Sequence, residues 1–170
     1  MSYSIAKLKV KKGLPEVHYS LTNNLGITSS YQVTINGIVH SDLADALERL
    51  KSHLCLITEL INPMLLGGFE GVRSLLNAGE LHSHEAFSGY NVTGFSQSGE
   101  GVVLVGNRTL STNKVLNIIA PYTLMNADSD NPYASDLWSD VHDLVDETVL
   151  LLNGKMSGEQ LDLFAESEAA

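Results

Sequence analysis

Alternating apolar and polar side chains mark three segments near the N-terminus as strands, each with one buried and one exposed face. In the clearest of them, Val17, Tyr19 and Leu21 lie on one side of the chain and polar residues lie on the other. The predicted strands span residues 7–10, 16–22 and 31–35. Because the segments between them are short, we expect these strands to pair as an antiparallel meander.

A helix is predicted next, because apolar residues then recur at every third or fourth position and therefore share one face. Ser41 or Asp42 is expected to cap its first turn. The residues of its apolar stripe are Leu43, Leu47, Leu50, Leu54 and Ile57. A stripe on one side only predicts a helix that packs on a sheet.

The second half of the chain repeats this order of strands followed by a helix. Strands are predicted over residues 90–95, 102–106 and 114–120. A second long helix should close at Asn153-Gly154. Its apolar face carries Leu137, Val141, Leu144, Thr148 and Leu151. Residues 58–89, between the two halves, are interpreted as a long excursion from the sheet that includes a short helix over residues 71–76.

Together these elements predict an α+β fold, with a single antiparallel sheet of about six strands and two long helices packed on one face. The chain has 170 residues, of which 44% are hydrophobic and 18% are charged, and this composition suits one globular domain. We place that domain at residues 1–154. Residues 155–170 are expected to form a flexible acidic tail.

The single cysteine, Cys55, has no partner for an internal disulfide and lies among apolar residues. We interpret it as a small buried hydrophobe, with a catalytic thiol as the alternative. No apolar run is long enough to span a membrane, and the first residues lack the features of a signal peptide. These observations lead us to expect a cytoplasmic protein that does not contact a membrane.

The formal net charge of −10 argues against direct binding of nucleic acid across the surface, because phosphate binding depends on Lys and Arg. A local basic strand remains an alternative, since lysines crowd the first dozen residues. These lysines are Lys7, Lys9, Lys11 and Lys12. On a strand, however, lysines more often form a solvated face that blocks association of sheet edges.

The end of the chain isolates three large apolar residues, Leu161, Leu163 and Phe164, between polar and acidic segments. Neither flanking segment has the composition to build a core. Exposed apolar clusters on a tail usually mark a binding segment. The alternative is that these residues pack on the domain itself as a last strand or helical turn.

The pentapeptide Gln160-Leu161-Asp162-Leu163-Phe164 resembles the segment with which bacterial polymerases, mismatch-repair proteins and other replication factors dock on the DNA polymerase sliding clamp. The resemblance implies that Leu163 and Phe164 enter an apolar pocket of the clamp, that Leu161 helps to fill the groove, and that Gln160 forms a hydrogen bond at its edge. Asp162 stands where that family of motifs uses a small or acidic residue. The resemblance covers five residues and leaves the body unassigned.

His82, His84 and Glu85 form a second candidate site, for a divalent metal. Two histidines at i and i+2 would point to one side of a strand, and Glu85 would add a carboxylate. A third histidine would have to come from His18, His40, His53 or His142. Because no Cys pair or longer His pattern supports a zinc site, we expect His82, His84 and Glu85 to lie in a solvated loop without a structural metal.

The layout of the body and the tail is similar in style to small uncharacterised phage and prophage proteins. We therefore expect a non-enzymatic accessory or modulator of DNA replication or recombination, without a cofactor, in a bacterial cell or a phage-infected host. Its expected partner is the sliding clamp. Two alternatives stay open, namely a self-assembling structural protein that uses its sheet edges or the apolar segment 62–69, and a metal-dependent enzyme that uses His82, His84 and Glu85.

Overall fold

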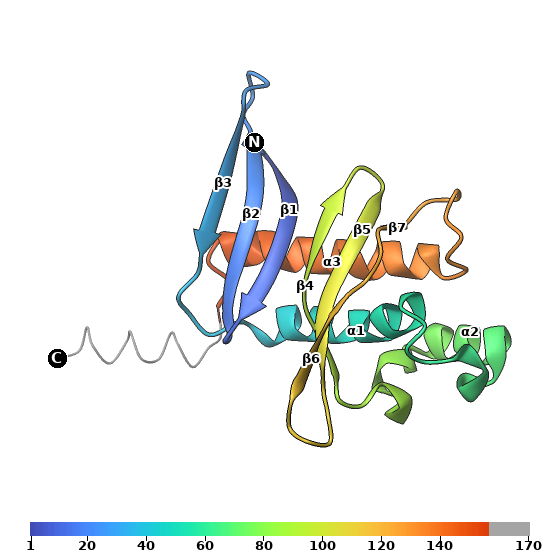
Figure 1. Cartoon of the computed structure of the whole chain (residues 1–170). Helices are drawn as coiled ribbons and strands as arrows, with labels where there is room; N and C mark the ends of the chain where they lie inside the picture. The colour runs from blue at the N-terminus through green and yellow to red at the C-terminus, as the bar shows by residue number, and fades with distance from the viewer. Residues whose placement is uncertain (157–170) are drawn as a thin grey trace.

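An antiparallel sheet runs across the whole molecule in the computed structural model, which describes residues 1–156 (Figure 1). The order of its strands is β3-β2-β1-β4-β5-β6, and a short seventh strand pairs with β5. The strands are β1 (Ser2–Lys11), β2 (Leu14–Thr22), β3 (Thr28–Thr34), β4 (Tyr90–Ser98), β5 (Gly101–Thr109), β6 (Val115–Ile119) and β7 (Thr123–Leu124). The predicted antiparallel sheet of about six strands is therefore confirmed.

The sheet consists of two three-stranded meanders that meet at its centre. The turn between β1 and β2 uses Lys12 and Gly13, both with positive φ, and tight hairpins favour that conformation. The two meanders are joined by a short pairing of β1 with β4, in which Leu8 lies opposite Phe95. A long connection between β3 and β4 thus brings segments about 90 residues apart side by side.

Two long helices, α1 (Ser41–Ile57) and α3 (Ala134–Leu152), cover the same face of the sheet (Figure 1). The cap of α1 differs from the prediction. His40, rather than Ser41 or Asp42, is the N-cap, because its backbone is extended and its Nδ1 accepts a hydrogen bond from the Asp42 amide at 3.2 Å. Imidazole nitrogen replaces the hydroxyl or carboxylate oxygen that usually caps a helix.

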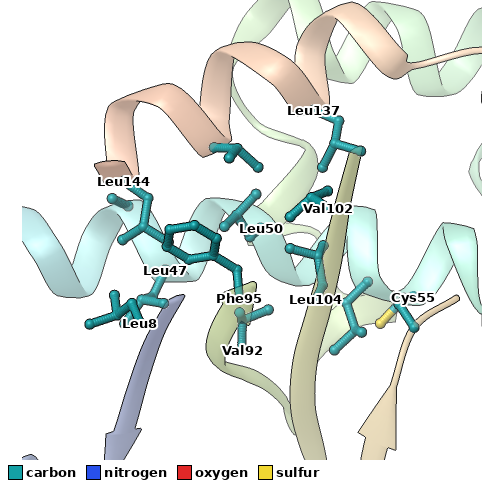
Figure 2. Packing of buried hydrophobic residues seen from close by; sticks show 14 of the residues in the cluster. Leu8, Leu47, Leu50, Cys55, Val92, Phe95, Val102, Leu104, Leu137 and Leu144 are labelled. Carbon is teal, nitrogen blue, oxygen red and sulfur yellow. The ribbon is translucent and has the colours of Figure 1, made fainter. Parts of the chain in front are cut away.

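The core lies between this helical layer and the sheet (Figure 2). Leu50 of α1, Phe95 of β4 and Leu144 of α3 are essentially inaccessible to solvent. A polar contact lies in the same layer, where the buried His53 is 3.0 Å from a carboxylate oxygen of Asp140. Arg49 approaches the other oxygen of Asp140 at 3.5 Å, so α1 and α3 are joined by apolar packing and by a charged pair.

The segment between α1 and β4 contains more structure than the sequence predicts. It forms a third helix, α2 (Gly68–Ala78), which is longer than the short helix expected over residues 71–76, and three single-turn helices that the sequence does not predict. The single turns are η1 (Pro63–Leu66), η2 (Leu81–Ser83) and η3 (Glu85–Phe87). Gly67, with φ of +87°, joins η1 to α2 in the left-handed conformation, a junction that glycine permits and that the apolar pattern alone does not reveal.

None of the helices within residues 1–156 is both long enough and apolar enough to cross a membrane.

Gly94 is expected to be essential to the centre of the sheet. A Cβ added there would overlap the Leu8 carbonyl oxygen on β1. We predict that Gly94→Ala lowers the free energy of unfolding by about 1–3 kcal/mol, because overpacking forces backbone shifts. Chemical denaturation would measure the loss. Ser96→Ala, two residues further along β4, is the matched control, and equal stability of the two variants would contradict the prediction.

Candidate functional site

A cavity of about 920 Å³ opens between the sheet and the first half of α3. Three parts of the chain that are distant in sequence line it: β1, the β4–β5 hairpin, and the loop before α3 together with α3 itself. The lining residues that carry hydrogen-bonding or aromatic groups include Ser4, Gln97, Glu100, Asn126, Asn131 and Trp138. We take this cavity as the candidate functional site of the body, since binding sites are usually concave and hold a few convergent polar groups.

The cavity exists because β1 and β4 separate beyond their short central pairing. Their ladder covers only Lys7 to Lys9 of β1, and a β-bulge between Ile5 and Lys7 displaces the first half of that strand. The Gln97 side chain spans the opening, since its Nε2 donates to the Ile5 carbonyl at 2.6 Å. One wall of the cavity is therefore held by a side chain in place of a backbone ladder.

The opposite wall is fixed by hydrogen bonds from the segment that follows β6. The Tyr122 hydroxyl donates to the Ser98 carbonyl at 2.7 Å, and the Met125 amide donates to the Glu100 carbonyl at 2.9 Å. The Asn126 side chain also donates to the Glu100 carboxylate. These bonds anchor the loop before α3 to the β4–β5 hairpin.

Trp138 projects from α3 at the mouth of the cavity and is 49% exposed. Its ring stacks on His142, with ring centroids 3.9 Å apart, and the His142 Nδ1 lies 2.9 Å from the Trp138 carbonyl oxygen. This stack holds the indole in one orientation.

Asn131 supplies an unused donor to this region. Its Oδ1 accepts a hydrogen bond from the Tyr133 amide at 3.1 Å. Its Nδ2 is buried without a hydrogen-bond partner among the residues that the structure describes. An unsatisfied buried donor costs free energy, and such groups are found where a site binds a ligand or water.

The chemistry of the lining suits a neutral or cationic group. Within residues 1–156 the lining set includes the carboxylate of Glu100 and no Lys or Arg, so it offers no cation to a phosphate. Amides, hydroxyls and an indole suit a ligand with several hydrogen-bonding groups and a flat apolar face.

The sequence does not predict this cavity. Two of the lining segments, residues 98–101 and 127–132, have compositions typical of a turn and a polar loop, which do not indicate a site. The one available signal was Trp138, the only tryptophan of the chain, at a helical position next to the apolar stripe.

The proposed metal ligands lie in the excursion, on two single-turn helices and the residue between them, so the strand geometry considered for His82 and His84 does not occur. His84 is the N-cap of η3: its Nδ1 accepts from the Ala86 amide at 3.1 Å, and its ring packs edge-on against Phe87. Over residues 1–156 the structure contains no group of three His, Cys, Asp or Glu side chains placed to hold a metal.

The other histidines have separate roles. His18 is 2.9 Å from Glu16, and this hydrogen bond lowers the pKa of the Glu16 carboxyl. His40 caps α1, His53 contacts Asp140, and His142 stacks on Trp138. The structure does not bring any of them together with His82 and His84 as a three-ligand group.

The clamp-like segment, Gln160 to Phe164, lies outside the described residues. The described chain ends at Met156, next to a charged contact that joins the end of α3 to the start of α1. Lys155 Nζ lies 2.6 Å from Asp42 and 2.8 Å from Glu147. These hydrogen bonds raise the pKa of Lys155, and the bond from Lys155 lowers the pKa of Asp42.

Cys55 is fully buried on α1, as the sequence predicts (Figure 2). Burial raises the pKa of its thiol to about 12, although Lys51 and Arg108 oppose the shift. Since the thiolate is the reactive form, the protonated thiol has little nucleophilic character at neutral pH. The geometry therefore favours the structural interpretation over a catalytic thiol.

We predict that Cys55 of the native protein reacts with a thiol reagent such as DTNB at pH 8 at least about 100-fold more slowly than the unfolded chain, because reaction requires opening of the core. A stopped-flow or absorbance assay with and without denaturant would measure both rates. Because the folded pKa is raised, the contribution of Cys55 to stability is complete below its ordinary value of 9.0 and declines as the pH rises towards about 12. Similar rates in the native and unfolded states would contradict the prediction.

Comparisons with protein-family models, with curated proteins and with solved structures found no match to this chain.

Proposed function

We propose that this protein is a non-enzymatic accessory or modulator of DNA replication or recombination that docks on the bacterial sliding clamp through residues 160–164. The observation that carries the proposal is the pentapeptide itself. It combines Gln160 with three large apolar residues, and the residues after it are small or acidic. We place this activity in the cytoplasm of a bacterial cell or a phage-infected host.

The end of the described body supports such a docking role. The Lys155 contacts with Asp42 and Glu147 fix the point from which the chain continues. Gln160 follows Met156 by four residues, so an extended chain can place it at most about 14 Å away. A clamp bound to the pentapeptide would then lie close to the body, at the end where α3 terminates.

The free energy expected for docking of the pentapeptide corresponds to a reversible complex. Burial of three large apolar side chains yields roughly 5–9 kcal/mol before the cost of ordering the tail is subtracted. Micromolar affinity corresponds to about 8 kcal/mol. We therefore expect a dissociation constant in the micromolar range or weaker for one pentapeptide.

The charge of the body favours a protein partner over direct contact with DNA. Lysines Lys7 and Lys9 are on β1, but Lys9 lies opposite Glu16 on β2 and His18 lies opposite Lys7. Lys7 and Lys9 also help to lower the pKa of Glu16. A carboxylate on the neighbouring strand thus lies beside these lysines and offsets their charge, and the whole chain carries a formal charge of −10.

We predict that replacing both Leu163 and Phe164 with Ala abolishes binding to a purified bacterial sliding clamp. The change removes roughly 3–6 kcal/mol of apolar burial, which exceeds what a micromolar complex can lose and remain detectable. Titration calorimetry of the full chain against the clamp would measure this loss. The melting temperature of the body should stay nearly unchanged.

The matched control is the double variant Glu166→Ala and Glu168→Ala, which changes the same tail outside the pentapeptide and should retain binding within a few-fold. Two results together would refute the proposal: no binding of the native chain at tens of micromolar clamp, and a large fall in melting temperature for the Leu163→Ala, Phe164→Ala variant. The second result would mean that these side chains belong to the core.

A further inference from the structure

The two edges of the sheet differ in chemistry. β3, with the mostly polar sequence Thr-Ser-Ser-Tyr-Gln-Val-Thr, forms one edge, while β6, with the sequence Val-Leu-Asn-Ile-Ile, forms the other. Native proteins usually protect edge strands with charged residues, proline or a bulge. Between Val115 and Ile119, β6 has no charged residue and no proline, and its register with β5 shows no bulge.

Alternate residues of β6 direct their backbone groups away from β5. The Leu110 amide donates to the Lys114 carbonyl, and the Ala120 amide donates to the Leu104 carbonyl, so even-numbered residues of this segment form the ladder. In an antiparallel pair the intervening residues point their N–H and C=O groups outward. Among residues 1–156, Val115, Asn117 and Ile119 therefore present the unpaired backbone groups of this edge.

The same residues expose apolar side chains. Val115 is 58% exposed and Ile119 is 72% exposed, and both lie on the sheet face opposite the helices. Leu116, on the helical face, is 47% exposed. Figure 1 shows the β5–β6 hairpin extending past α1, so the helical layer does not cover its tip.

We propose that β6 is a homodimer interface, in which it pairs antiparallel with β6 of a second copy about a two-fold axis at Asn117. In this register Val115 lies opposite Ile119 of the second copy, and Ile119 lies opposite Val115. An isologous contact requires this kind of self-complementarity. All three residues with outward backbone groups then find partners, and the two sheets join into one.

The register also avoids electrostatic conflict. Lys114 lies opposite Ala120 of the second copy, so the two lysines are at opposite ends of the joined strands. Pro121 follows Ala120 and, since it has no N–H, limits the pairing to this segment. A shift of the pairing by two residues would leave some outward groups unpaired, so the register centred on Asn117 is the most favourable.

The opposite edge provides a natural comparison. The Ile35 amide donates to the Pro15 carbonyl, which makes the even-numbered residues of β3 the outward-facing ones. These residues are Thr28, Ser30, Gln32 and Thr34. These side chains are polar, and of the large apolar residues of β3 only Tyr31 is strongly exposed, so pairing of two β3 edges would bury less apolar surface than pairing of two β6 edges.

A strand of five residues buries a small area, so the dimer should be weak and depend on concentration. Sedimentation equilibrium of the full chain from about 5 to 500 µM should show a shift from the 18.4 kDa monomer towards twice that mass. Asn117→Pro should keep the protein monomeric over this range, because it removes the central outward N–H and leaves the β5 ladder intact. Ile119→Lys should do the same by placing a charge in the apolar contact.

Gln32→Pro is the matched control, since it makes the same change at the outward-facing centre of β3 and should leave dimerisation unchanged. Equal melting temperatures of the three variants would show that the fold is retained. The inference does not rest on clamp docking, and a chain with Leu163 and Phe164 replaced by Ala should dimerise normally.

A cross-link tests the register directly. Asn117→Cys places two thiols opposite each other, with Cα atoms about 5.5 Å apart, which is within the range for a disulfide. Mild oxidation should yield a covalent dimer that a reductant separates, while Gln32→Cys should not, and the native Cys55 is buried. A monomer throughout the concentration range, or a dimer that persists in both Asn117→Pro and Ile119→Lys, would overturn the proposal.

Discussion

Burial of α1 on two sides is the constraint on which the rest of the structure depends. One side of this helix packs on β4 and β5 and another packs on α3, so Leu50 and Leu54 have no exposed surface. The contact with the sheet is close enough that a Cβ at Gly106 of β5 would overlap the side chain of Leu54. Because α1 and α3 share one face, within residues 1–156 they leave the opposite face of the sheet uncovered, and the edge strands β3 and β6 each pair on one side only (Figure 1).

The main elements could be predicted because they depend on local patterns. Alternation specified the strands, and the spacing of Leu43 to Ile57 specified α1. The cap of α1 was missed because imidazole rarely takes that role, and α2 was underestimated because its glycines interrupt an apolar segment. The choice of the cap residue and the continuation of α2 through its glycines both depend on tertiary contacts, which the hydrophobic pattern does not contain.

The candidate site and the exposed edge at β6 could not be predicted from the sequence for a different reason. The cavity depends on where β1 and β4 separate, and the pairing of Leu8 with Phe95 joins segments far apart in the chain. The edge position of β6 depends on the same pairing, because it places the second meander with β4 inside and β6 outside. Long-range register, which local periodicity does not contain, therefore determines both surfaces. The clamp-like pentapeptide is the reverse case, since the sequence alone suggested it.

In a dimer joined through β6, the distance between the two tails determines whether both pentapeptides can dock on one clamp. The Tyr3 hydroxyl on β1 donates to the Asn153 side chain at the end of α3, so the tail begins near β1 rather than near β6. In a dimer joined through β6, about seven strand spacings of about 4.8 Å would separate the two copies of β1 in the direction across the sheet, or roughly 34 Å. Each tail adds at most about 14 Å before Gln160. The register also places Asn117 level with the far end of β1, so the two Tyr3 residues of a flat dimer would be displaced in opposite directions along the strands and lie roughly 70 Å apart. With both tails included, the two Gln160 residues would lie on the order of 40–100 Å apart, and only a clamp whose two grooves are separated by such a distance would gain affinity from simultaneous docking.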